Sequence, residues 1–108
     1  MDSLDRQTTR MAPPPKKLDG ADVLVWATLG KSVSPTSYCS HTVGGAEVGP
    51  AAALAICVYF DRTLEYYLFH CDQMWRVLDD TCHDTLELAQ RQAEAEYAGV
   101  ASLWRTRT

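Results

Sequence analysis

The chain has 108 residues, of which 46% are hydrophobic and 22% are charged, and its formal net charge at pH 7 is −4. This length allows one domain with one hydrophobic core. The longest apolar run, residues 51–60, is much shorter than the ~20 residues that a membrane-spanning helix needs. The first fifteen residues lack the apolar segment of a secretory signal, so we expect a cytoplasmic protein with reduced cysteines.

Charge is distributed unevenly along the chain. Residues 1–20 contain four basic and three acidic side chains, a net charge of +1, whereas residues 21–108 contain six basic and eleven acidic side chains, a net charge of −5. An acidic folded part repels the phosphate backbone of nucleic acids and favours a basic partner. We therefore expect the partner to be another protein, with no nucleic acid and no membrane.

Residues 1–17 are predicted to form a disordered tail, and residues 18–108 a single domain. The tail is polar and has no apolar periodicity, and its three consecutive prolines at 13–15 favour an extended conformation.

Several strands are predicted in the domain. Residues 22–29 and 64–72 are rich in β-branched and aromatic side chains, which favours strands. Periodicity cannot separate helix from strand in the apolar run 51–60, but the β-type side chains of its second half favour a strand. Residues 75–78 are predicted to form a further short strand. Residues 30–50, rich in glycine, serine and proline, are predicted to form a loop, with room for a short strand around residues 38–43.

One helix is predicted from Asp84 to Ala98. Asp84 is a suitable N-cap, Glu87 completes a capping box, and Gly99 stands where a helix commonly ends. Apolar residues at helical spacing form one face, and the glutamates, Glu96 included, are assigned to solvent. The predicted fold is therefore α+β: an antiparallel sheet of about four strands with one C-terminal helix packed on one face.

The second half of the chain resembles a group of small bacterial proteins that have no assigned activity. The resemblance lies in a strand ending in Tyr-Leu-Phe-x-Cys-Asp, a Trp, an Asp-Thr-x-His segment and a helix with the pattern Glu-x-Ala-x-x-Gln-Ala-Glu-x-Glu-Tyr. It implies antiparallel strands and a helix. The matching residues are Tyr67, Leu68, Phe69, Cys71, Asp72, Trp75, Asp80, Thr81, His83, Glu87, Ala89, Gln92, Ala93, Glu94, Glu96 and Tyr97.

Cysteine and histidine occur together in three short clusters, at residues 39–41, 70–71 and 82–83. Four such side chains could hold tetrahedral zinc, but the paired spacing that marks zinc sites is absent. In a strand, His70 and Cys71 would also point to opposite faces. We therefore predict no metal and no cofactor, and interpret the cysteines of the strands as small core residues.

The alternative to a binding module is a small enzyme or metal-binding domain built on His83. A nucleophilic Cys71 or Cys82 would need a histidine as base and a carboxylate, Asp80 or Asp84, to orient that histidine. Any chain with four cysteines and three histidines offers such pairs. No catalytic residue is therefore predicted.

Four aspartates, at positions 72, 79, 80 and 84, surround the last predicted strand and the helix start. Their spacing does not match a calcium-binding loop. Aspartate favours turns and helix N-termini, where its oxygens accept backbone hydrogen bonds, and we interpret these residues in that way.

The candidate binding surface is placed around the segment that joins the last strand to the helix. We expect His83 to bond with Asp80, fixing the turn, or with a partner. From size, charge and the absence of a catalytic motif, we predict a small non-enzymatic protein-binding module. Its concrete form would be an immunity- or antitoxin-like inhibitor of a basic partner. The candidate binding residues are Asp72, Trp75, Asp80, Thr81 and His83.

Overall fold

The computed structural model describes residues 11–30, 33–35, 41–43, 46–48, 51–60 and 65–107, and the secondary-structure elements are located in these ranges. In chain order they are β1 (Lys17–Leu18), β2 (Ala21–Thr28), β3 (Ser34–Pro35), β4 (His41–Val43), β5 (Ala46–Val48), β6 (Ala53–Val58), β7 (Tyr66–Cys71), β8 (Val77–His83), α2 (Leu86–Glu96), β9 (Tyr97–Ala98) and the 3₁₀ helix η1 (Val100–Ser102).

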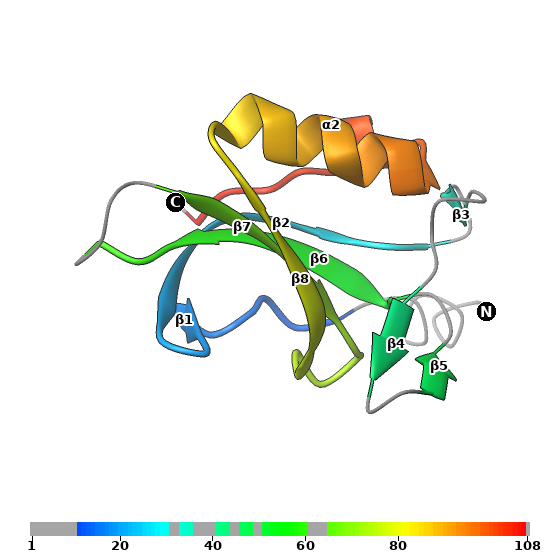
Figure 1. Cartoon of the computed structure of the whole chain (residues 1–108), viewed down its shortest axis with the longest axis horizontal. Coiled ribbons are helices and arrows are strands. Elements are labelled where there is room, and N and C mark those ends of the chain that lie inside the picture. Colours follow the sequence, from blue (N-terminus) through cyan, green and yellow to red (C-terminus); the bar gives the residue numbers. More distant parts are fainter. Residues whose placement is uncertain are drawn as a thin grey trace, which may run out of the picture.

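The predicted α+β fold is confirmed, with five strands in the main sheet rather than about four. The strand order is β1-β2-β6-β7-β8 and all neighbours are antiparallel. The sheet is curled, and α2 lies across one of its faces (Figure 1). Two small two-stranded sheets, β3-β9 and β4-β5, accompany it. The segment 30–50 is predicted to be a loop with room for a short strand around 38–43. Its described part contains β3, β4 and β5, and β4 falls within that range.

The apolar run 51–60 contains a strand because both faces of that strand are covered. All six residues of β6 are buried. Leu54 and Ile56 face α2 and belong to one apolar core, whereas Ala55 and Cys57 belong to a second core on the opposite face. A strand that is buried on both faces loses the usual alternation of polar and apolar residues, which is why periodicity could not identify it.

Residues 11–16, predicted to belong to a disordered tail, run along the face of the sheet opposite α2 (Figure 1). Met11 packs against the second core, and the Trp75 indole N–H donates to the Ala12 carbonyl at 2.8 Å. The Arg107 guanidinium donates to the Pro14 carbonyl at 3.0 Å. The sequence prediction missed these contacts because both donors are distant along the chain. Residues 1–10 of the predicted tail lie outside the described residues.

The two edges of the main sheet are covered differently. The outer edge of β2 pairs with β1 along its first half, and further along with Arg105, which exchanges two backbone hydrogen bonds of 3.0 and 2.8 Å with Trp26. At the other edge, β4 lies near β8 but pairs with β5. Among the described residues, no strand pairs with the outer edge of β8.

The last strand and the helix have different bounds from those predicted. β8 spans Val77–His83, so the segment 79–83, predicted to be a turn, is strand, while Trp75 lies in the preceding turn with a φ of +62°. The run of polar residues there fits a strand that is partly exposed to solvent at the edge of the sheet. The N-cap of α2 is Thr85 rather than Asp84: the Thr85 hydroxyl accepts the Leu88 amide at 3.0 Å.

The helix ends at Glu96 rather than Ala98, because the next two residues pair with β3 as β9. Gly99 follows with a φ of +100°, a left-handed conformation that glycine adopts readily, and it precedes η1. Among the described residues, no helix has both the length and the apolar character needed to cross a membrane.

Candidate functional site

The strand register divides the predicted binding residues of β8 between two faces. Thr81 is opposite Leu68, which belongs to the core under α2, so Thr81 and His83 share the face toward the helix. Asp80 is opposite Phe69, which belongs to the second core, and it therefore points to the other face. The structure brings Thr81 and His83 together and separates both from Asp80.

The remaining two predicted residues, Asp72 and Trp75, stabilise the turn between β7 and β8, at the end of β8 away from His83. One Asp72 oxygen accepts the backbone amides of Met74 and Arg76 at 2.8 and 2.9 Å, and the other accepts Arg76 Nε at 2.7 Å. These bonds, the Arg76 amide first among them, lower the pKa of Asp72. Trp75 is buried and bonded to Ala12.

His83 bonds to Thr81, and the predicted bond to Asp80 is wrong. The His83 Nε2 and Thr81 Oγ1 atoms are 2.7 Å apart. Thr81 and His83 are two residues apart in a strand and therefore share a face, whereas Asp80 points to the other face. The predicted turn did not include this alternation of side chains. Burial lowers the pKa of His83, and the nearby His70 contributes in the same direction, while the carboxylates of Glu96 and Asp84 oppose the shift.

A buried polar cluster that the sequence did not predict lies beside His83, under α2. His70 Nε2 on β7 and Glu96 Oε1 on α2 are 2.6 Å apart, and the two side chains are 1% and 5% exposed. Gln92 Nε2 donates to the second Glu96 oxygen at 2.7 Å. The signal in the sequence was the spacing of Ala89, Ala93 and Glu96, which places Glu96 on the apolar face of the helix.

The buried position of this cluster makes it a structural contact between helix and sheet. A substrate cannot reach a histidine that is 1% exposed, and a buried charge or polar group needs its partner to be stable in the core. His70 and Glu96 therefore fix α2 over β7. They do not form an accessible acid–base pair.

The three cysteines of the described residues all have thiol pKa values above the ordinary one, which disfavours the reactive thiolate. Cys57, Cys71 and Cys82 are free thiols. Burial raises the pKa of Cys71 to about 12 and that of Cys57 further still. Cys71 belongs to the second core, on the face of the sheet away from His83. Partial burial and then the Glu65 carboxylate raise the pKa of the exposed Cys82 thiol, so it too stays protonated.

The described residues contain no group of three or more His, Cys, Asp and Glu side chains that could hold a metal ion. Of the three Cys–His clusters in the sequence, the first lies mostly outside the described residues, Cys39 included. In the other two, neighbouring residues belong to opposite faces of a strand: His70 and Cys71 of β7, and Cys82 and His83 of β8.

An open groove lies between β8 and the flank of α2. Its volume is about 390 Å³. Leu88 is 43% exposed there, although most leucines are buried. The lining residues are Cys82, His83, Asp84, Leu88, Arg91 and Gln92.

Comparison with known proteins gives no further assignment: no family model, no curated protein and no solved structure matches this chain.

The stability of the protein should decrease below pH 6.5 in a way that depends on His83. Its folded-state pKa lies below the ordinary value of 6.5, because burial disfavours the imidazolium. As the pH falls through 6.5, the unfolded chain binds the proton first, so the free energy of unfolding falls until the pH reaches the folded-state pKa. Urea midpoints measured from pH 7 to pH 5 should fall less steeply in His83→Gln. An equal slope in both proteins would contradict this assignment.

Proposed function

We propose that this chain is a small non-enzymatic protein-binding module that binds a basic partner through β8 and the start of α2. The observation that carries the proposal is the exposed acidic surface that these two elements form. Asp80, Asp84 and Glu87 are exposed, and the sequence has no lysine or arginine from residue 77 to residue 90. A partner of opposite charge is favoured at such a surface.

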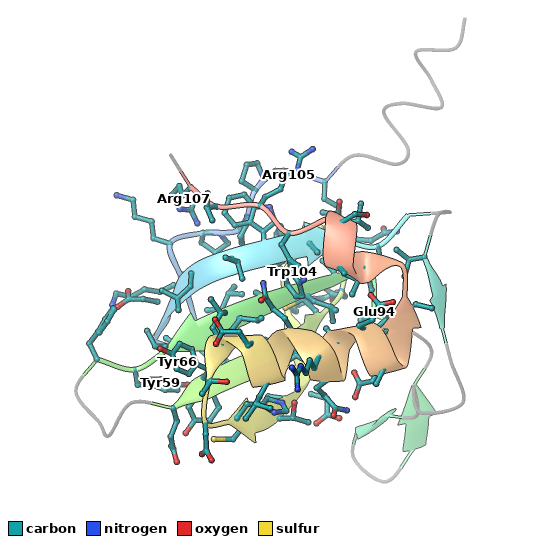
Figure 2. The ribbon with its side chains drawn as sticks, turned by 90° about the horizontal axis from the view of Figure 1, so that it is seen from above. Tyr59, Tyr66, Glu94, Trp104, Arg105 and Arg107 are labelled. Carbon is teal, nitrogen blue, oxygen red and sulfur yellow. The ribbon has the colours of Figure 1, made fainter. Side chains whose placement is uncertain are left out.

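The opposite edge of the sheet has the reverse properties and supports the same proposal. β1 and Arg105 cover the edge of β2, and Arg105 and Arg107 lie on that side (Figure 2). Lys16 and Lys17 are also exposed there. The side of the sheet at β1 and β2 is thus basic and covered within the chain, whereas the side at β8 and the start of α2 is acidic.

An enzymatic role through His83 has less support. The described thiols have raised pKa values, and His83 shares its groove with Cys82 and Asp84 but lies on a different face from Cys71 and Asp80. By analogy of size and charge, we propose that the module acts as an immunity- or antitoxin-like inhibitor in the cytoplasm. The resemblance to a group of small bacterial proteins is part of this proposal. Because that group has no assigned activity, the resemblance suggests none for this chain.

Two double variants that remove the same charge from opposite edges test the proposal. Asp80→Asn/Asp84→Asn changes the β8 surface, and Asp19→Asn/Asp22→Asn changes the β1–β2 side. The basic protein that the natural chain retains from cell extract is identified, purified and titrated against all three forms. The β8 variant should weaken its binding about tenfold, because two exposed charge pairs are lost.

The control variant should bind like the natural chain and remove only a surface ion pair between Lys17 and Asp22. Equal affinity for the natural chain and the β8 variant would overturn the proposed surface. A partner that is acidic rather than basic would overturn the proposed function.

A further inference from the structure

We infer that the face of the sheet opposite α2 carries a second binding surface, which recognises a proline-rich segment of another protein and is occupied by residues 11–16 as an internal competitor. This inference goes beyond the proposed function and uses different residues. Trp75, Arg107 and the Trp26 ring form the surface, and we call it the donor surface. Residues 11–16 run along it on the side of the sheet away from the helix (Figure 1).

The donor surface holds residues 11–16 through their backbone carbonyl groups. The Trp75 indole N–H donates to the Ala12 carbonyl at 2.8 Å. Arg107 Nη2 donates to the Pro14 and Pro15 carbonyls at 3.0 and 3.1 Å. These acceptors are main-chain atoms that every extended segment has, so the hydrogen bonds do not restrict recognition to the side chains of this particular segment.

The donors match the hydrogen-bonding groups of a proline run. Proline has no backbone N–H, so residues 13–15 offer carbonyl acceptors and no donor. Tryptophan and arginine side chains are donors only. The N–H groups of an ordinary strand would find no acceptor on these two side chains, and a strand edge would in turn leave its own carbonyl groups unpaired against a proline run. The donor surface therefore selects proline-rich segments.

The side chains of the segment meet the sheet at positions three apart. Met11 packs on the second core and Pro14 is buried. Residues 12, 13 and 15 are exposed. A polyproline helix has three residues per turn, and consecutive prolines are confined to it because each ring fixes its own φ and disfavours the α region of the residue before it. The pattern that fits is thus an apolar residue, two variable residues and a proline.

The two donors are also held by the rest of the fold. The Arg107 guanidinium carbon lies 5.2 Å from the centroid of the buried Trp26 ring, a cation–π contact. The backbone of Arg105, two residues earlier, is bonded to that of Trp26. The Trp75 amide donates to the Asp72 carbonyl at 3.0 Å. We therefore expect the donor surface to keep its form when the segment leaves it.

The segment can leave without disturbing β1. Asp19 and Gly20 have φ values of +49° and +83°, and positive φ at both central residues of an Asp-Gly turn is typical of a stable two-residue hairpin. This hairpin keeps Leu18 buried, and the Lys16 carbonyl accepts the Val23 amide at 2.9 Å. Release therefore involves the residues before Lys16.

A second copy of this chain is a poor occupant. Exchange of the segment between two copies would replace each contact by the same contact and would still cost the entropy of association. A different protein with a better segment gains contacts, but it has to compete with residues 11–16, whose short tether gives them an effective concentration in the millimolar range. The natural chain should therefore bind such a partner weakly until its own segment is displaced.

The test uses a full-length variant in which the segment is released. Met11→Ser/Pro14→Ser removes the two groups that face the sheet and leaves the donor surface intact. The probe is a capped, fluorescein-labelled peptide, Leu-Ser-Pro-Pro-Pro-Arg, which keeps the spacing of residues 11–16 but changes the sequence. A control peptide has serine in place of the leucine and of the middle proline. Affinities are measured by fluorescence anisotropy.

The released variant should bind the probe about tenfold or more tightly than the natural chain does. Adding Trp75→Phe, which removes the indole N–H and keeps an aromatic ring, should weaken binding about threefold to tenfold, and adding Arg107→Leu should have a similar effect. Arg105→Leu is the matched control and should change nothing, because Arg105 bonds through its backbone. The control peptide should bind at least about tenfold more weakly than the probe.

Equal affinity of the natural chain and the released variant would overturn the inference, and so would unchanged binding after both Trp75→Phe and Arg107→Leu. A dimer of the natural chain that the probe does not disrupt would assign the surface to a second copy instead. If the released variant does not fold, the natural chain is titrated with millimolar unlabelled peptide. The NMR signal of the Trp75 indole N–H, identified by its loss in Trp75→Phe, should move with the proline peptide. A signal that stays in place, or moves equally with the control peptide, would also overturn the inference.

Discussion

Replacing Glu96 with alanine should lower the free energy of unfolding by about 3–5 kcal/mol, because it leaves a buried histidine without its carboxylate partner. The Nε2–Oε1 distance is 2.6 Å, and water cannot take the place of the carboxylate without entering a packed region, since His70 is 1% exposed. Gln92 also loses its acceptor, although it lines the open groove and can bond to solvent instead. Urea denaturation at pH 7 measures the change.

Two controls separate the buried pair from other effects of the Glu96 substitution. Glu94→Ala removes a carboxylate from the same helix that accepts the amides of Gly99 and Ala101 at 2.9 and 3.0 Å, and it should cost about 1 kcal/mol. His70→Leu/Glu96→Leu removes both polar groups together and should recover most of the stability lost in Glu96→Ala. A double variant as unstable as the single one would show that the pair is not the cause.

Deleting residues 2–16 should lower the free energy of unfolding by roughly 2–4 kcal/mol, because residues 11–16 cover the second core. Met11 packs on that core and Pro14 is buried. The deletion also exposes Trp75, which is 8% exposed and bonded to Ala12, so its fluorescence should shift to longer wavelength. Urea denaturation followed by tryptophan fluorescence gives both quantities.

The matched control is deletion of residues 2–10, which ends just before the contacts described above. That variant should unfold at the same urea concentration as the full chain. Equal stability of the two deletions would mean that residues 11–16 contribute nothing to the fold. A large loss in the shorter deletion would move the start of the stabilising segment toward the N-terminus.

The sequence alone predicted the elements whose evidence is local. The strand 22–29 was identified from its β-branched and aromatic residues, and β2 spans Ala21–Thr28. The hairpin of β6 and β7 followed from two apolar runs separated by a short polar segment. The helix was found from its spacing, and the α+β class followed from these elements. Each of these features depends on residues that are close together in the sequence, so the sequence alone is enough to predict it.

Three features depended on partners far along the chain, and the sequence did not predict them. The carboxylate of Glu96 is buried because His70 lies 26 residues earlier in sequence and directly beneath α2 in space. Residues 11–16 are held by Trp75, 63 residues after Ala12.

The length of β8 was missed for the same reason. Polar residues 79–83 carry no local strand signal, and they extend because β7 supplies the hydrogen-bonding partners. The candidate groove was missed for the same reason. Cys82 and His83 are visible in the sequence as part of a polar segment before a helix, but their division between two faces comes only from the strand register.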